Sequence, residues 1–288
     1  MAITKVMDLI NPEVLADTIS ASLESGIKFA PHAKVDTTLV GEAGDTITRP
    51  KYAYIGAAKD LEEGVAIDPS LMSMTTTKVT IKEVGNAVAP TSKAILTNVD
   101  GTLSEAAKQL ALSVSDKIEI DYVEALDEAI LGYSGEPTSI SNIIDALSVF
   151  NDEDDEDYIL FINPSDYTEL RKEAIDGNTF LTREQLADLL GLKDIVRTKR
   201  VEAGTAYIQK DGAVEIIYKK TPEINTGYDE LKRVVNIVID TLYAVNLYND
   251  KGVVKIVEGF EAPEDDGEGN GDGNGDDDET PDVTPPEG

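Results

Sequence analysis

The residues that come closest to a ligand set lie in the last 28 residues, where acidic side chains alternate with glycine. Asp266, Glu268, Asn270 and Asp272 stand at alternate positions, with glycine at the sixth position of the tract. Oxygen donors at this spacing are typical of a calcium loop of the EF-hand kind. The twelfth position, however, is Asp277 in place of the bidentate glutamate, and neither flank can form a helix. A plain solvated tail is the alternative, since a repetitive Gly/Asp tract produces such spacing by chance.

Elsewhere the sequence offers few groups for catalysis. His32 is the single histidine, so a Ser-His-Asp triad or a histidine metal site would depend on it, and no nucleophile motif adjoins it. Cysteine is absent, which excludes disulfides, thiolate zinc sites and cysteine nucleophiles. The acidic cluster at 152–157 could bind a divalent cation, but we favour a solvated loop between a helix and a strand. Phosphate-binding and nucleophile-elbow motifs are missing, so we expect neither an enzyme nor a cofactor.

The charge balance limits the classes of partner. There are 56 acidic and 25 basic residues, for a formal net charge of -31. A chain this acidic lacks the basic footprint of a protein that binds nucleic acid tightly from solution, and it is repelled by anionic membranes. No segment has the apolar length of a signal peptide or of a membrane span. We therefore expect a protein that is made and used in the cytoplasm, without a membrane partner.

Apolar spacing predicts the elements of the first half. A helix over 11–25 begins with Asn11 as N-cap and Pro12 in the first turn. Two short strands at 45–50 and 51–55, and an alternating strand at 76–84, enclose a long polar tip that cannot bury much surface by itself. Thr102 opens a capping box, and a long helix follows to about residue 131. Its apolar residues recur at helical spacing: Leu103, Ala107, Leu110, Val114, Ile118, Ala125 and Ala129.

The second half is predicted to be mixed α/β. Apolar residues indicate a helix near 143–150, and an apolar run predicts a strand over 158–162 that stops at Asn163-Pro164. Further elements are two helices at 165–174 and 182–190, the second with its own capping box, a hairpin over 206–218 around Asp211-Gly212, and strands at 234–248 and 253–257. From Glu261 onward there are 12 acidic residues and no basic ones, and we expect this tail to be disordered.

Several segments in this order resemble one family. They are NPEVLADTISASLESGIKFAPHAKVDTTLVGEAGDTITRPKYAYIG, DLEEGVAI, TTTKVTIKEVGNAVAPTSKAILT, EAAKQLALSVSDKIEIDYVEAL and VVKIVEGF. Together they resemble the major capsid proteins of tailed bacteriophages with the Hong Kong 97 type of fold, many from phages of Gram-positive bacteria. The resemblance covers roughly residues 3–260 and is most specific over 11–126. No single motif is diagnostic, because the order of the segments carries the likeness.

The resemblance implies an α+β capsid fold with an N-terminal arm, an extended β-hairpin loop, a long spine helix and a mixed α/β axial domain. The implied parts are the arm with its helix (1–35), the extended loop with peripheral-domain strands (36–98), the spine helix of the peripheral domain (99–135), the axial domain (136–245), a strand returning to the peripheral domain (246–260) and the acidic tail (261–288).

The resemblance also implies a structural role without catalysis. Copies would assemble through pentamers and hexamers into an icosahedral shell, a virion component that encloses double-stranded DNA without sequence-specific binding. A separate scaffolding protein and a portal would be further partners, and assembly would take place in the cytoplasm of the host bacterium. The residues expected to contact neighbouring subunits are on the extended loop: Lys51, Tyr54, Lys59, Glu62, Glu63 and Asp68.

Two other classes stay open at this point. A calcium-dependent surface or adhesion protein would use the acidic Gly-rich tail, but it requires export, and no export signal is visible. A hydrolase or nuclease with acidic metal ligands is the other class, and it lacks any ordered motif.

Overall fold

The computed structural model describes most of the chain between residues 28 and 260. The described residues are 28–41, 43–52, 55, 57–58, 60, 69, 71–72, 74–97, 102–153, 156–176 and 182–260. The predicted helix at 11–25 and the acidic tail lie outside them.

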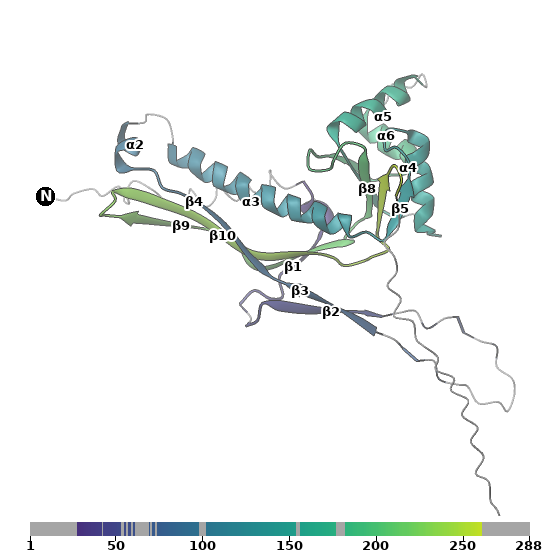
Figure 1. Cartoon of the computed structure of the whole chain (residues 1–288), viewed down its shortest axis with the longest axis horizontal. Helices are drawn as coiled ribbons and strands as arrows, with labels where there is room; N and C mark the ends of the chain where they lie inside the picture. Colours follow the sequence, from purple (N-terminus) through teal and green to yellow (C-terminus); the bar gives the residue numbers. More distant parts are fainter. Residues whose placement is uncertain are drawn as a thin grey trace, which may run out of the picture.

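Two sheets and a two-stranded ribbon organise these residues (Figure 1). The four-stranded sheet has the order β1 (Lys34–Asp36), β9 (Val214–Asp229), β10 (Val234–Leu247), β4 (Lys82–Val88). The five-stranded sheet has the order β5 (Leu131–Ser134), β11 (Val253–Val257), β8 (Thr205–Lys210), β6 (Tyr158–Ile162), β7 (Asp194–Arg197). The ribbon pairs β2 (Thr46–Tyr52) antiparallel with β3 (Met74–Thr80).

A long helix, α3 (Thr102–Asp127), lies along the four-stranded sheet and contacts β10, β4 and β9 (Figure 1). Its 26 residues correspond to about 39 Å of helix at about 1.5 Å per residue. The predicted apolar stripe is confirmed, because Ala107, Leu110, Val114 and Ile118 are buried. The predicted end near residue 131 is wrong. The chain leaves the helix after Asp127, and Leu131 begins β5, where it pairs in parallel with β11.

The central strands of the five-stranded sheet, β11, β8 and β6, are buried on both faces, which explains their continuous apolar sequences. On one face, Ile159 and Phe161 of β6 join the core beneath α3, where Phe29 stacks on Tyr122 with ring centroids 4.8 Å apart. On the other face, the intervening residues pack against three helices. These helices are α4 (Ile140–Leu147), which continues into η3 (Ser148–Phe150), α5 (Pro164–Asp176) and α6 (Arg183–Leu190).

The capping box predicted at the start of α6 is present in the structure. The Thr182 hydroxyl accepts a hydrogen bond from the Gln185 backbone N–H, and the Gln185 side chain accepts one from the Thr182 N–H, which completes the capping box. Gly191 ends the helix with φ +71°, a conformation that glycine adopts without steric cost. The structure also confirms the strand predicted at 158–162 and the helices predicted near 165–174 and 182–190.

The predicted hairpin at 206–218 is wrong. Gly212 does provide a turn, with φ +73°, but β8 and β9 on its two sides belong to different sheets. Both strands are buried on both faces here, so their apolar pattern could not identify their partners. The hairpin of this region joins β9 to β10 instead.

Strand pairing also differs from the division into parts that the resemblance implied. β9 and β10, expected within the segment 136–245, pair with β1 and β4 and lie on α3. β11, expected to return toward the spine helix, pairs with β5 and β8 in the five-stranded sheet. The alternation of apolar residues fixes which face of a strand is buried but not which sheet the strand joins.

The ribbon and its surroundings complete the fold. Residues 46–52 form one strand in place of the two short strands expected at 45–50 and 51–55. β3 runs on into β4 with a break only at Ile81, so one stretch of chain serves both the ribbon and the four-stranded sheet. Two short helices flank these strands in the sequence: η2 (Ala30–His32) precedes β1, and α2 (Ser92–Thr97) follows β4. Among the described residues, no helix has the length and apolar character needed to span a membrane.

Candidate assembly interface

The ribbon is attached to the body by a buried ion pair. Arg49 of β2 donates two hydrogen bonds to Glu215 of β9, with Nε to Oε2 at 3.0 Å and Nη2 to Oε1 at 2.7 Å. The Glu215 side chain is 0% exposed, so its charge depends on this partner and on Lys34, whose ammonium lies 3.7 Å away. Arg49 also donates to Asp36 of β1. One guanidinium therefore ties β2 to two strands of the four-stranded sheet.

The electrostatics of this cluster favour the charged forms. Burial lowers the pKa of Arg49, but the hydrogen bond to Asp36 and the charge of Glu215 outweigh burial and raise it. Burial raises the pKa of Asp36, but hydrogen bonds from the Thr38 backbone and from Arg49 outweigh this and lower it. Both groups stay ionised at neutral pH, as the attachment requires.

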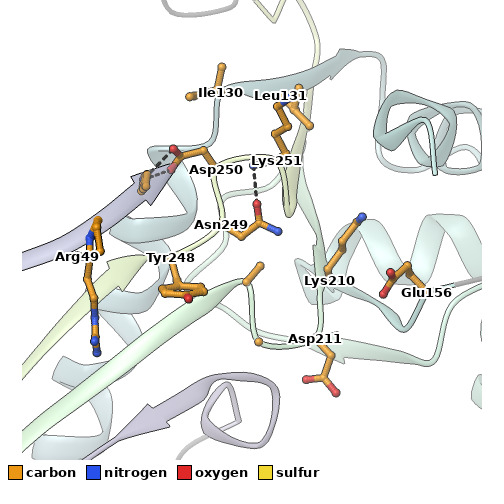
Figure 2. Close-up of a pocket in the computed structure, with 14 residues that line it drawn as sticks. Arg49, Ile130, Leu131, Glu156, Lys210, Asp211, Tyr248, Asn249, Asp250 and Lys251 are labelled. Atoms are coloured by element: carbon orange, nitrogen blue, oxygen red, sulfur yellow. Dashed lines mark hydrogen bonds and ion pairs between the residues drawn. The ribbon is translucent and has the colours of Figure 1, made fainter. Parts of the chain in front are cut away.

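A second, more exposed ion pair lies beside the first. The Lys51 ammonium is 2.6 and 2.7 Å from the two carboxylate oxygens of Asp250, in the turn between β10 and β11 (Figure 2). The two side chains are 28% and 34% exposed. Lys51, predicted to contact a neighbouring subunit, thus forms an ion pair within its own chain, on the part of β2 that pairs with the start of β3. The other predicted contact residues, Tyr54, Lys59, Glu62, Glu63 and Asp68, lie outside the described residues.

An apolar cluster completes the attachment at the base of the ribbon, where β3 runs into β4. Val79 and Ile81 are buried there against Ile217 and Ala244 of the four-stranded sheet. The predicted alternation of the strand at 76–84 is confirmed, since these two residues share the buried side. The ribbon is therefore held by packing at its base, where β3 meets β4, and by ion pairs further along β2.

The far end of the ribbon is different, because its apolar side chains are exposed. Leu71 is 92% exposed, and Ile55, Met72 and Met74 are each more than half exposed. A two-stranded ribbon has no third layer on which to bury such residues. Large apolar side chains that gather on an exposed surface typically mark a site of interaction with another molecule.

An open depression of about 700 Å³ lies between β2 and the body (Figure 2). It includes Lys210, Asp211 and Tyr248, together with the Lys51–Asp250 pair. Its cations are largely neutralised, since the Lys210 ammonium is 2.6 Å from Asp152. The depression offers ion pairs and a concave surface, and among its lining residues no nucleophile is in contact with a base.

The acidic cluster at 152–157 contributes to this ion pairing. Besides the contact of Asp152 with Lys210, Asp157 lies 2.6 Å from the ammonium of Lys193. Lysine ammonium groups thus form ion pairs with the carboxylates at both ends of this loop. In the part of the chain that the structure describes, no group of three or more His, Asp or Glu residues could hold a metal ion. The calcium candidates Asp266, Glu268, Asn270 and Asp272 belong to the tail and lie outside that part.

His32 is a packed residue at the end of η2. Its ring meets the edge of Phe161 with centroids 6.1 Å apart, and its carbonyl accepts hydrogen bonds from Gln209 and Gly212. Burial lowers the pKa of the imidazole, against the raising effect of Asp194. This environment fits the interpretation of His32 as an ordinary loop residue.

Sequence reasoning missed Arg49, Glu215 and Asp250 as the residues that hold the ribbon. One signal was available, because Glu215 interrupts the apolar run of Val214, Ile216 and Ile217. A carboxylate within a strand that is buried on both faces requires a cation partner. The identity of that partner, 166 residues earlier in the chain, could not be read from local spacing.

Comparisons with known proteins agree with this architecture. The profile of a family described as phage capsid protein matches residues 74–256. The chain is 34% identical over 265 residues to the major capsid protein of Staphylococcus phage phiMR11, covering 89% of this chain and 96% of that protein.

Solved capsid structures share the fold. The capsid of a native GTA particle has a TM-score of 0.68 at 10% identity and covers 81% of this chain and 90% of its own. The capsid of the cyanophage P-SCSP1u has a TM-score of 0.66 at 11% identity, with 82% and 89% covered. The expected α+β fold of the Hong Kong 97 type is confirmed by these likenesses. With the profile match and the relative from the Staphylococcus phage, they establish that this chain belongs to the phage capsid protein family.

Proposed function

We propose that this capsid protein builds an icosahedral shell around double-stranded DNA through pentamers and hexamers of identical copies. The observation that carries the proposal is the ribbon, which is fixed to the body by the buried cluster of Val79 and Ile81 and by the Arg49–Glu215 pair, and which presents exposed apolar residues at its far end. A surface fixed to its own body at one end and unburied at the other is suited to lie on a neighbouring copy.

The geometry of a closed shell explains why a ribbon that reaches a neighbouring copy is useful. Head-to-tail contacts between identical surfaces close into rings when the rotation fits, and rings of five and six require contacts that adapt. A long ribbon buries surface on a neighbour while the core of each copy stays rigid. Many such contacts, each of modest strength, make the assembled shell hard to dissociate.

We assign the peripheral domain to α3 with the four-stranded sheet, and the axial domain to the five-stranded sheet with α4, α5 and α6. The strand pairing supports this division, because each sheet has its own layer of helix and most of its own core. In this proposal, the axial domains meet at the centres of the rings. Assembly takes place in the host cytoplasm with a separate scaffolding protein and a portal, and the product is the virion shell.

The test is deletion of residues 55–71. We expect a protein that keeps its cooperative thermal unfolding, because the deletion spares the buried cluster at the base, but forms no shells. Sedimentation and negative-stain imaging of the protein co-expressed with its scaffold would show this. Normal particles from the deletion variant would refute the role of the ribbon.

A smaller change makes the test sharper. Leu71→Ser combined with Met72→Ser removes exposed apolar surface without shortening the ribbon. The matched control is Thr75→Ser with Thr76→Ser, on exposed positions of the same ribbon. We expect the first variant to shift the sedimentation profile toward small species and the control to assemble as the unmodified chain does. Equal behaviour of both variants would contradict an apolar contact at the far end.

A further inference from the structure

An open groove of about 740 Å³ at the edge of the five-stranded sheet is rich in cations, although the chain as a whole carries a formal charge of -31. It lies where η2, the start of α5, the start of α6 and the edge strand β7 meet. Its cationic side chains are Lys28, Arg183, Arg197, Lys199 and Arg200, and Asp194 is the carboxylate among its lining residues.

These cations differ in how far they are neutralised. Arg200 forms ion pairs with Asp116 and Glu119 of α3, and Arg183 lies 3.5 Å from Asp194. Arg197 and Lys199 are exposed, and within the described ranges no carboxylate forms an ion pair with either of them. The groove therefore keeps a surplus of positive charge that attracts an anionic ligand.

The guanidinium of Arg197 is held in place, which favours a specific site over a diffuse charge. It lies 5.1 Å from the centre of the Tyr167 ring, and its backbone carbonyl accepts a hydrogen bond from the Lys28 ammonium at 3.0 Å. The first contact orients the arginine, and the second brings Lys28 beside it. Two cations from distant parts of the chain are thus brought together in the groove.

We propose that this groove binds the acidic tail, residues 261–288. The tail has 12 carboxylates and no basic residue, so its charge is complementary to that of the groove. Its glycines allow it to follow the surface, and its carboxylates can pair with Arg197 as a planar fork and with Lys199 as a point charge.

The position of Phe260, the last described residue, makes the contact geometrically feasible. The ring of Phe260 packs beside Gly132 of β5, at the edge of the sheet opposite to β7. Four strand spacings of about 4.8 Å separate the two edges, roughly 19 Å in all. An extended segment of 28 residues spans up to about 90 Å, so the tail reaches the groove with length to spare.

Tethering favours the tail over the phosphates of nucleic acid. A covalently attached segment is present at an effective concentration of about millimolar, whereas a free duplex is repelled by the net negative charge of the chain. Binding of the tail would also reduce the repulsion among its own carboxylates, since each one that meets a cation in the groove is neutralised.

The test is carbodiimide cross-linking of the full chain, followed by mass spectrometry. This reagent joins a carboxylate to an amine only when the two are in contact. We expect Lys28 and Lys199 to be linked to tail carboxylates more often than Lys172 and Lys232, which are exposed lysines away from the groove. High salt should reduce these links, because the attraction is between exposed charges.

A matched pair of variants isolates the role of the groove. Arg197→Gln leaves both reporter lysines in place, and we expect the groove links to fall by about two- to fivefold, the range for loss of one exposed ion pair. Arg171→Gln removes the same charge from an exposed position of α5 outside the groove and should leave the links unchanged. Thermal unfolding curves of both variants show whether the fold is intact.

Three results would overturn the proposal. The first is links distributed over all lysines according to their exposure. The second is an equal effect of Arg197→Gln and Arg171→Gln. The third is a double-stranded oligonucleotide that displaces the tail and loses its own binding in Arg197→Gln, because this would identify the groove as a phosphate site.

Discussion

Replacing Arg49 by methionine should strongly destabilise the chain, because it leaves the buried carboxylate of Glu215 without its main partner. Removal of one member of a buried ion pair typically costs about 3–5 kcal/mol. We expect the lower end, about 3 kcal/mol, since Lys34 remains 3.7 Å from Glu215 and Arg49 is itself 21% exposed. For a chain of this size, this corresponds to a fall of about 6–12 °C in the melting temperature.

Calorimetry of the unassembled protein would measure this effect, with Lys51→Met as the matched control. Lys51 lies on the same strand, two residues away, and its pair with Asp250 is partly exposed, so we expect a loss of about 1 kcal/mol or less. The double variant Arg49→Met with Glu215→Leu should recover at least about 1 kcal/mol, because no charge is then left buried at position 215. Equal losses for Arg49→Met and Lys51→Met would refute the argument that burial sets the strength of the two attachments.

Other features of the structure lead to further predictions. Gly132→Ala should cost about 1–3 kcal/mol in urea titrations, because a Cβ there would lie 2.3 Å from the ring of Phe260. Burial raises the pKa of Asp121, but hydrogen bonds from two lysines and a tyrosine outweigh it and lower that pKa. Asp121 therefore contributes stability at neutral pH that is lost as the pH falls through its folded pKa, so Asp121→Asn should flatten the acid side of the stability profile. Thr182→Ala should cost about 1 kcal/mol by removing the cap of α6.

Each of these variants has its own control. Phe260→Ala combined with Gly132→Ala should recover part of the loss, since the steric conflict is then absent. Thr182→Ser keeps a hydroxyl at the N-cap and should be nearly neutral. An Asp121→Asn chain whose stability still falls as steeply in acid as the unmodified chain would show that other carboxylates dominate there.

Local signals predicted the elements that depend on local physics. The strands at 158–162 and 253–257 were found to the residue, because each is an apolar run bounded by a turn residue or by Asn163-Pro164. The end of α3 was misplaced because Ala129 and Leu131 continue the helical spacing and Gly132 resembles a C-terminal stop. Leu131 instead joins β11, which is more than 120 residues away in the sequence.

The candidate interface was harder to predict for the same reason. Two strands on either side of a polar segment were predicted, and the pairing of β2 with β3 confirms them. The pairing of Arg49 with Glu215 depends on the register of β9 in a sheet whose strand order the sequence does not reveal. Residue types indicated that a charge must be buried in this strand, but only the tertiary fold identifies the cation that meets it.

The break between β3 and β4 at Ile81 is the point about which the ribbon could rotate relative to the four-stranded sheet. β3 on one side pairs only with β2, whereas β4 on the other side is fixed in the sheet next to β10. The seven residues of β3 extend about 23 Å from this point, so a rotation of about 20° at Ile81 would displace their far end by about 8 Å. Such a rotation would pull Arg49 of β2, which is paired with β3, away from Glu215 and Asp36. These ion pairs therefore limit how far the exposed apolar end can move toward a neighbour.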